Sequence, residues 1–181
     1  LSAGVAAAIV RIEAIGSANG ARTVRVAETE DARARIWKGR KSAFGAIAVI
    51  KPDYYLNDTV IPRTRLAEVL TRVYEVVEER GLIVMNVFHA GDGNLHPLIV
   101  FDAREPGVME RVLEAGEEIV RISVEAGGVL SGEHGIGLEK KRFMSMQFSP
   151  ADLEAQDRLR RAFDPNGLAN PAKVLPSGAS C

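Results

Sequence analysis

The fold is decided by residues 82–101, which read LIVMNVFHAGDGNLHPLIVF. Two β-prone runs, Leu82–Phe88 and Leu98–Phe101, flank the turn sequence AGDGNL at 90–95. Such runs on either side of a glycine-rich turn predict two antiparallel strands. The other elements can be placed relative to this pair.

Helical patterns lie on both sides of the two strands. The first has its apolar residues at Leu66, Val69, Leu70, Val73 and Val77 and ends at Gly81. The second opens at Glu105-Pro106, with Pro106 in its first turn, and ends at Gly127-Gly128.

Read from residue 58, the order is strand, helix, strand, strand, helix, and a last strand at Val129–Ser131. This order is the split β-α-β pattern of ferredoxin-like sheets. We therefore predict an α+β protein with a ferredoxin-like core at 58–131, in which an antiparallel sheet carries packed helices.

Further elements are expected outside this core. Apolar residues at intervals of three and four predict an N-terminal helix, and a second helix is capped by Thr29 or Asp31. A short strand is predicted between them at 23–27. Residues 137–181 are expected to form C-terminal helices, one opened by Ser149-Pro150, followed by an irregular tail.

Composition excludes several classes of protein. The 181 residues carry 23 basic and 24 acidic side chains, and this balance argues against nucleic-acid binding. No apolar run approaches the roughly 20 residues that a transmembrane helix needs. The single cysteine, Cys181, excludes an internal disulfide and a thiolate cluster. We expect a cytoplasmic protein, with peripheral attachment to the inner membrane left open.

All three histidines lie in two glycine-rich segments. If Asp92-Gly93 forms a two-residue hairpin turn, His89 lies opposite His96 on the same face of the sheet. Two imidazoles in that arrangement can chelate one divalent metal, although a longer loop would shift the pairing. The alternative is a pair of surface histidines beside a tight turn.

The second segment, GGVLSGEHGIG at 127–137, adds a carboxylate and a third imidazole. It could be a plain connector or a phosphate-binding loop, but its spacing fits neither the dinucleotide fingerprint nor the P-loop. We favour Glu133 as a third metal ligand, with the imidazole of His134 left free beside the metal. Two histidines and one carboxylate suit Zn²⁺, Mn²⁺ or Fe²⁺ and leave positions open for substrate.

Arg40, in the sequence WKGRK at 37–41, is a further candidate. A tryptophan followed by basic residues usually means a packed ring beside a solvated charged face. A guanidinium group can, however, bind a carboxylate in bidentate geometry.

Three motifs in this order resemble the C-terminal domain of FAD-linked oxidases of the vanillyl-alcohol oxidase type. They are His89–His96, Gly127–Gly137 and FDPNGLANPAK at 163–173. Trp37–Arg40 and Tyr54–Pro62 fit as well. Within this family, the sequence is most similar to the flavin-dependent chain of bacterial glycolate oxidases and to D-lactate dehydrogenases.

The resemblance implies a substrate or cap domain that helps to oxidise a D-2-hydroxy acid to the 2-oxo acid, with two electrons passed to FAD. It also assigns roles to individual residues. His89, His96 and Glu133 bind a divalent metal that polarises the substrate hydroxyl, and His134 is the base. Arg40 binds the substrate carboxylate, and Asn170 meets the flavin edge.

Comparison with the family also narrows the substrate. Pro97-Leu98-Ile99 and Leu56 replace polar or basic residues of relatives that act on dicarboxylic acids, which favours glycolate or D-lactate. The tail has Asn-Pro-Ala-Lys where the family usually has Asn-Pro-Gly-Lys, so Ala172 replaces a glycine.

The chain begins inside a helical pattern without Met, and we expect it to be the C-terminal part of a longer flavoenzyme. Its own N-terminal FAD-binding domain, and other oxidase subunits, would be its partners. We expect the chain alone to fold but to bind FAD weakly and to turn over no substrate. Two alternatives keep the same site: a metal-dependent hydrolase with His134 as base, and a non-catalytic module that holds metal or mediates assembly.

Overall fold

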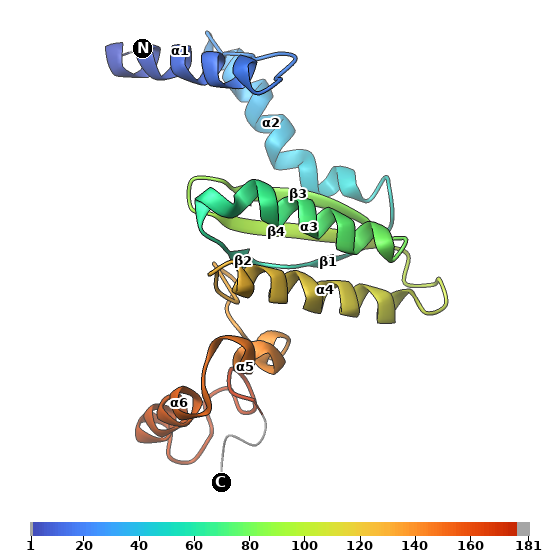
Figure 1. Ribbon diagram of the computed structural model, residues 1–181, viewed down its shortest axis with the longest axis vertical. Coiled ribbons are helices and arrows are strands. Elements are labelled where there is room, and N and C mark those ends of the chain that lie inside the picture. The colour runs from blue at the N-terminus through green and yellow to red at the C-terminus, as the bar shows by residue number, and fades with distance from the viewer. Residues whose placement is uncertain (1, 177–181) are drawn as a thin grey trace. The chain divides into compact units, whose positions relative to one another are not determined.

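The computed structural model describes residues 2–176 (Figure 1). Predictions about Cys181 and the end of the tail at 177–181 lie outside these residues. The elements are α1 (Ala3–Ala18), α2 (Glu30–Ile47), β1 (Asp53–Leu56), β2 (Thr59–Val60), η1 (Arg63–Arg65), α3 (Leu66–Glu79), β3 (Ile83–His89), β4 (Asn94–Phe101), α4 (Val108–Glu125), η2 (Lys140–Phe143), α5 (Met144–Gln147) and α6 (Pro150–Phe163).

The chain divides into two compact units, Leu1–Ala46 and Ile47–Cys181. The first holds α1 and nearly all of α2. Thr29 caps α2, because its hydroxyl accepts a hydrogen bond from the backbone N–H of Ala32. The strand predicted at 23–27 is absent from this described segment. The alternating pattern was misleading there, because no neighbouring strand supplies the hydrogen bonds of a ladder.

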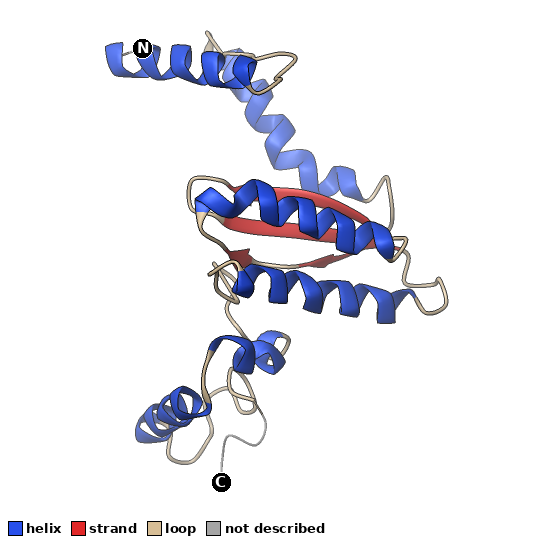
Figure 2. Ribbon diagram, in the orientation of Figure 1, coloured by secondary structure: helices blue, strands red, loops and turns tan. Residues whose placement is uncertain are grey.

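The second unit is built on an antiparallel sheet with β4 in the middle (Figure 2). Strand β3 pairs with one edge of β4, and β1 and β2 pair in succession with the other edge. The backbone of Val129 bridges Val60 of β2, which extends the same antiparallel sheet. The α+β class and the split β-α-β order are therefore confirmed, with the predicted last strand reduced to a single bridge.

Helices α3 and α4 cover one face of this sheet (Figure 2). Side chains alternate along a strand, so Leu95, Ile99 and Phe101 of β4 point to the helices. Val69, Val73 and Val77 of α3 meet them, and each has no exposed area. Burial of each such side chain contributes roughly 1.5–3 kcal/mol, so this layer supplies much of the folding free energy.

The opposite face of the sheet carries His96, Leu98 and Val100 of β4. Leu98 and Val100 form a small cluster with Ile47, and apolar residues of β1 and β3 pack partly against it. This face therefore combines a minor apolar cluster with the histidine that the sequence singled out.

The C-terminal helices pack on α4 through a separate cluster formed by Val120, Leu130, Phe143, Met144 and Leu153. The predicted capping box at the start of α6 is confirmed: Ser149 and Asp152 exchange side-chain and backbone hydrogen bonds. Within residues 2–176, no helix is both long enough and apolar enough to span a membrane.

The structure differs from the predictions in the register of the hairpin and in the start of α4. The loop between β3 and β4 has four residues, Ala90–Gly93, so His89 pairs with Asn94 and Val87 with His96. Gly93 takes a φ of 74°, and its position against the backbone oxygen of Ile61 leaves no room for a side chain. Helix α4 begins at Val108 rather than near Pro106, because Gly107 precedes it with a left-handed φ of 72°.

We expect Gly128→Ala to destabilise the chain by roughly 3 kcal/mol, at the upper end of the cost of overpacking. A Cβ atom there would meet the backbone oxygens of Val60 and Ser123, the latter at 2.6 Å. Urea denaturation would measure the loss. Gly91→Ala is the matched control, because its Cβ would have no neighbour within 4 Å. Equal stability of the two variants would contradict this packing.

Candidate metal centre

Three potential metal ligands come together on the face of the sheet opposite α3 and α4. His89 is the last residue of β3, His96 lies in β4, and Glu133 lies in the loop after α4. One ligand atom from each lies within 4.8 Å of the other two. Oε1 of Glu133 lies 3.4 Å from Nε2 of His89 and 3.5 Å from Nε2 of His96.

These distances fit ligands that share one first-row metal ion. With metal–ligand bonds of about 2.0–2.2 Å, neighbouring donors around a tetrahedral ion are about 3.4 Å apart. The donor set of two imidazoles and one carboxylate suits Zn²⁺, Mn²⁺ or Fe²⁺. His96 is buried, whereas the side chains of His89 and Glu133 are about half exposed, so the cluster is open toward solvent.

The corrected hairpin register keeps both histidines on one face. The observed pairing differs from the predicted one by two residues, and strand side chains alternate with a period of two. The rings of His89 and His96 are therefore still close, with centroids 5.7 Å apart. The prediction therefore placed both histidines on the correct face of the sheet, but it paired His96 with His89 instead of with Val87.

Burial affects His96 directly. Desolvation lowers the pKa of its imidazole, while the negative charge of Asp58 opposes that shift. A lower pKa favours the neutral ring, which is the form that binds metals. Its Nε2 faces Glu133, and its Nδ1 is buried without a hydrogen-bond partner, 3.9 Å from Oδ1 of Asp58.

Asn94 is a site residue whose role the sequence analysis missed. It takes the position opposite His89, and its Nδ2 donates a 2.7 Å hydrogen bond to Oε1 of Glu133. A Cβ at Gly132 would lie 2.6 Å from the Asn94 amide, so glycine permits this close approach. The longer loop puts Asn94 in this place, and only the observed register reveals it.

Asp58 is the second residue that the sequence analysis missed. It lies between β1 and β2, has no exposed surface, and accepts hydrogen bonds from Ser131 and from the backbone N–H groups of residues 132–134. Nζ of Lys140 lies 3.2 Å from its carboxylate. Desolvation tends to raise the pKa of this carboxyl, but the hydrogen bonds and the Lys140 charge outweigh it and hold the pKa well below its usual range.

His134 lies beside the cluster without belonging to it. Its ring centroid is 5.2 Å from that of His96, and its backbone is held by Asp58. An imidazole next to a bound metal, but not coordinated to it, is free to accept a proton from a substrate.

The other two predicted site residues lie on separate elements. Arg40 is on α2, in the unit Leu1–Ala46, and its approach to substrate stays a prediction. Asn170 lies in the tail after α6 with a left-handed φ of 46°. Ala172, which replaces the family's usual glycine, is also left-handed at 62°, a conformation that favours glycine.

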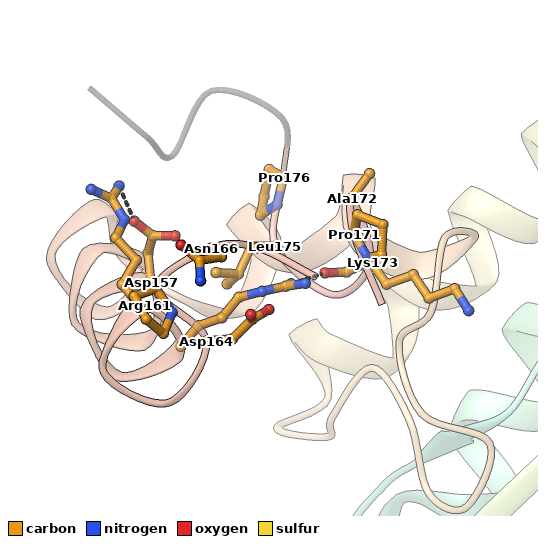
Figure 3. A pocket seen from close by; sticks show the side chains of 12 residues that line it. Asp157, Arg161, Asp164, Asn166, Pro171, Ala172, Lys173, Leu175 and Pro176 are labelled. Atoms are coloured by element: carbon orange, nitrogen blue, oxygen red, sulfur yellow. Dashed lines mark hydrogen bonds and ion pairs between the residues drawn. The ribbon is translucent and has the colours of Figure 1, made fainter. Parts of the chain in front are cut away.

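A pocket of about 570 Å³ lies between α6 and this tail (Figure 3). Its polar lining includes Arg160, Asp164 and Lys173, together with the ion pair of Asp157 and Arg161. None of the three clustered ligands lines it, so the pocket and the candidate metal centre are distinct places.

Comparisons with known proteins agree with the motifs. Residues 3–174 match the family described as FAD linked oxidases, C-terminal domain. Glycolate oxidase subunit GlcD of Escherichia coli (strain K12) is 49% identical over 162 residues, which cover 90% of this chain and 32% of that protein. The Bacillus subtilis (strain 168) subunit GlcD is 35% identical over 169 residues, covering 93% of this chain and 36% of that protein.

A probable mitochondrial D-lactate dehydrogenase of Danio rerio is 33% identical over 165 residues, covering 90% of this chain and 33% of that protein. The chain thus spans about a third of the length of these relatives. Sequence motifs, fold and family match all lead to one assignment: the chain belongs to the FAD linked oxidases and corresponds to their C-terminal domain.

Proposed function

We propose that this chain is the substrate- and metal-binding part of an FAD-dependent enzyme that oxidises a small D-2-hydroxy acid, glycolate or D-lactate, to the 2-oxo acid. The observation that carries the proposal is the convergence of His89, His96 and Glu133 beside His134. Relatives named as glycolate oxidase subunits and a D-lactate dehydrogenase support the substrate class.

In this proposal His89, His96 and Glu133 hold a divalent ion of Zn²⁺, Mn²⁺ or Fe²⁺. When bound, such an ion supplies Lewis acidity to the substrate hydroxyl. His134 accepts the hydroxyl proton, and Arg40 binds the carboxylate as a bidentate partner. Binding of the carboxylate orients the substrate, and loss of the hydroxyl proton to His134 prepares C2 to give up its hydride.

FAD supplies the acceptor for two electrons. We assign Asn170 to the flavin edge from the family resemblance. The guanidinium of Arg160 holds the tail around it, because it donates to the backbone oxygens of Ala169, Asn170 and Lys173. The rest of the cofactor would be held by an N-terminal domain of the longer enzyme. Other oxidase subunits are further candidate partners.

The surroundings of His96 favour a small aliphatic substrate. Val87 pairs directly with His96, and Leu98 follows on the same face opposite Leu56. Pro97 and Ile99 also contributed to the prediction of a small substrate from the sequence. They point to the helix side of the sheet and do not face the cluster. Val87 beside His96, and the buried Leu98 with its partner Leu56, are apolar and offer no cation to a second carboxylate.

We expect the chain to bind one Mn²⁺ or Zn²⁺ ion, measurable by titration calorimetry. Changes around metal ligands typically cost 10–100-fold in affinity, so loss of a ligand in His96→Ala should cost more than roughly 100-fold. His134→Asn should keep the affinity, because His134 lies outside the ligand set. Equal affinity of His96→Ala and the unchanged chain would exclude this metal centre.

In the longer enzyme, His134→Asn should lower kcat for glycolate or D-lactate by roughly 10²-fold or more, because the proton acceptor is lost. Reduction of an artificial electron acceptor measures the rate, and metal content is measured on the same sample. A variant that retains its metal and oxidises substrate at nearly the normal rate would rule out His134 as the base.

A hydrolysis assay with ester and peptide substrates completes this test, because a metal-dependent hydrolase would need no flavin. We expect no hydrolysis by the metal-loaded chain. Hydrolysis that disappears in the His134→Asn variant would favour the alternative use of the same residues.

A further inference from the structure

Asp58 connects the sheet to the loop that carries Glu133 and His134. Three consecutive backbone N–H groups, those of residues 132–134, lie 2.9–3.3 Å from its carboxylate oxygens. The hydroxyl of Ser131 donates a further bond of 2.7 Å. One carboxylate therefore receives donors from four residues in a row.

Lys140 ties the far end of the same loop to Asp58. Its Nζ donates a 2.5 Å hydrogen bond to the backbone oxygen of Asp58 and lies 3.2 Å from the carboxylate. Lys140 is itself buried, with 7% of its surface exposed. The loop from Ser131 to Lys140 is thus attached at both ends to one residue of the sheet.

Burying the Asp58 carboxylate costs free energy of desolvation, and the hydrogen bonds that offset this cost constrain the loop backbone. A buried carboxylate is tolerated only when donors replace the lost water, and here backbone amides are the main donors. Amides can point at one acceptor only if the backbone dihedrals of residues 132–134 take a narrow set of values. Those dihedrals fix the directions in which the side chains of Glu133 and His134 leave the backbone.

The same carboxylate also faces a ligand histidine. Oδ1 of Asp58 is 3.9 Å from Nδ1 of His96, and the ring's other nitrogen faces Glu133. Asp58 is therefore next to one candidate ligand in the sheet and holds the backbone of another in the loop. At this distance the contact with His96 is electrostatic, so Asp58 acts on the ring through its charge and on Glu133 through the backbone.

We infer that Asp58, paired with Lys140, is a positioning residue that holds Glu133 and His134 in register with His96, so that its loss weakens metal binding even when the fold is intact. The inference rests on the proposed metal centre. Asp58 touches neither substrate nor flavin in the proposed site and acts through the loop.

A purely structural role is the competing explanation, and a pair of variants separates the two. Asp58→Asn removes the charge and leaves Lys140 buried without its partner, which by itself lowers stability. The double variant Asp58→Asn/Lys140→Met removes both charges at similar volume and should recover the part of the stability that the unpaired Lys140 charge costs. It cannot restore the carboxylate that orders the loop.

The experiment uses the full 181-residue chain with Co²⁺ as the probe. Thermal unfolding reports stability, titration gives Co²⁺ affinity, and the visible absorption of bound Co²⁺ reports ligand geometry. We expect the double variant to be folded and more stable than Asp58→Asn, yet to bind Co²⁺ about 10–100-fold more weakly than the unchanged chain, with an altered spectrum. Ser131→Ala, which removes one donor, should show a smaller loss.

Asp157→Asn is the matched control. Asp157 is also a buried acid, exposed by 7%, and it pairs with Arg161 within α6. This variant should lose stability but keep its Co²⁺ affinity and spectrum.

Two results would overturn the inference, and they can be told apart. If the unchanged chain binds Co²⁺ and the double variant or Ser131→Ala matches its affinity and spectrum, the positioning role is wrong but the metal centre stands. If the unchanged chain binds no Co²⁺, the metal centre is wrong and the positioning role is overturned with it.

Discussion

The candidate site depends on the hydrogen bonds that the buried carboxylate of Asp58 accepts. Asp58 has no contact with water, so its charge is stable only where protein donors surround it. The chain supplies them from the loop after α4, and that requirement brings the loop back to the sheet. Glu133 and His134 are carried on that loop, so the geometry of the candidate ligands and base follows from the same hydrogen bonds.

Side chains alternate along β4, so the residues that form the main core lie on one face and the candidate metal ligand His96 lies on the other. One set of residues packs against α3 and α4 and forms the main core. The other set includes His96 and faces away from those helices. A central strand that is buried along its whole length holds His96 rigidly, which suits a ligand whose position has to be defined before metal binds. His89 and Glu133 are more exposed and complete an open side that substrate could reach.

Glycines matter where the backbone of one segment has to approach another. Gly93 allows the four-residue turn that puts Asn94 opposite His89, and Gly132 allows the loop to lie against the Asn94 amide. Asn94 then donates to the oxygen of Glu133 that faces both histidines. Gly93 and Gly132 therefore have a steric explanation that is independent of phosphate binding.

Local patterns in the sequence were sufficient to predict the elements that neighbouring residues determine. Apolar periodicity predicted α3 and α4, the Ser149-Pro150 signal predicted the start of α6, and the period of two kept His89 and His96 on one face. The chemical types at residues 89, 96, 133 and 134 likewise indicated a metal-binding site. The tertiary structure alone decided the hairpin register and the roles of Asn94, Asp58 and Lys140. Asp58 and Lys140 are 82 residues apart, and their buried contact forms only when the chain brings the segment after α4 back to the sheet, which no local pattern of residues encodes.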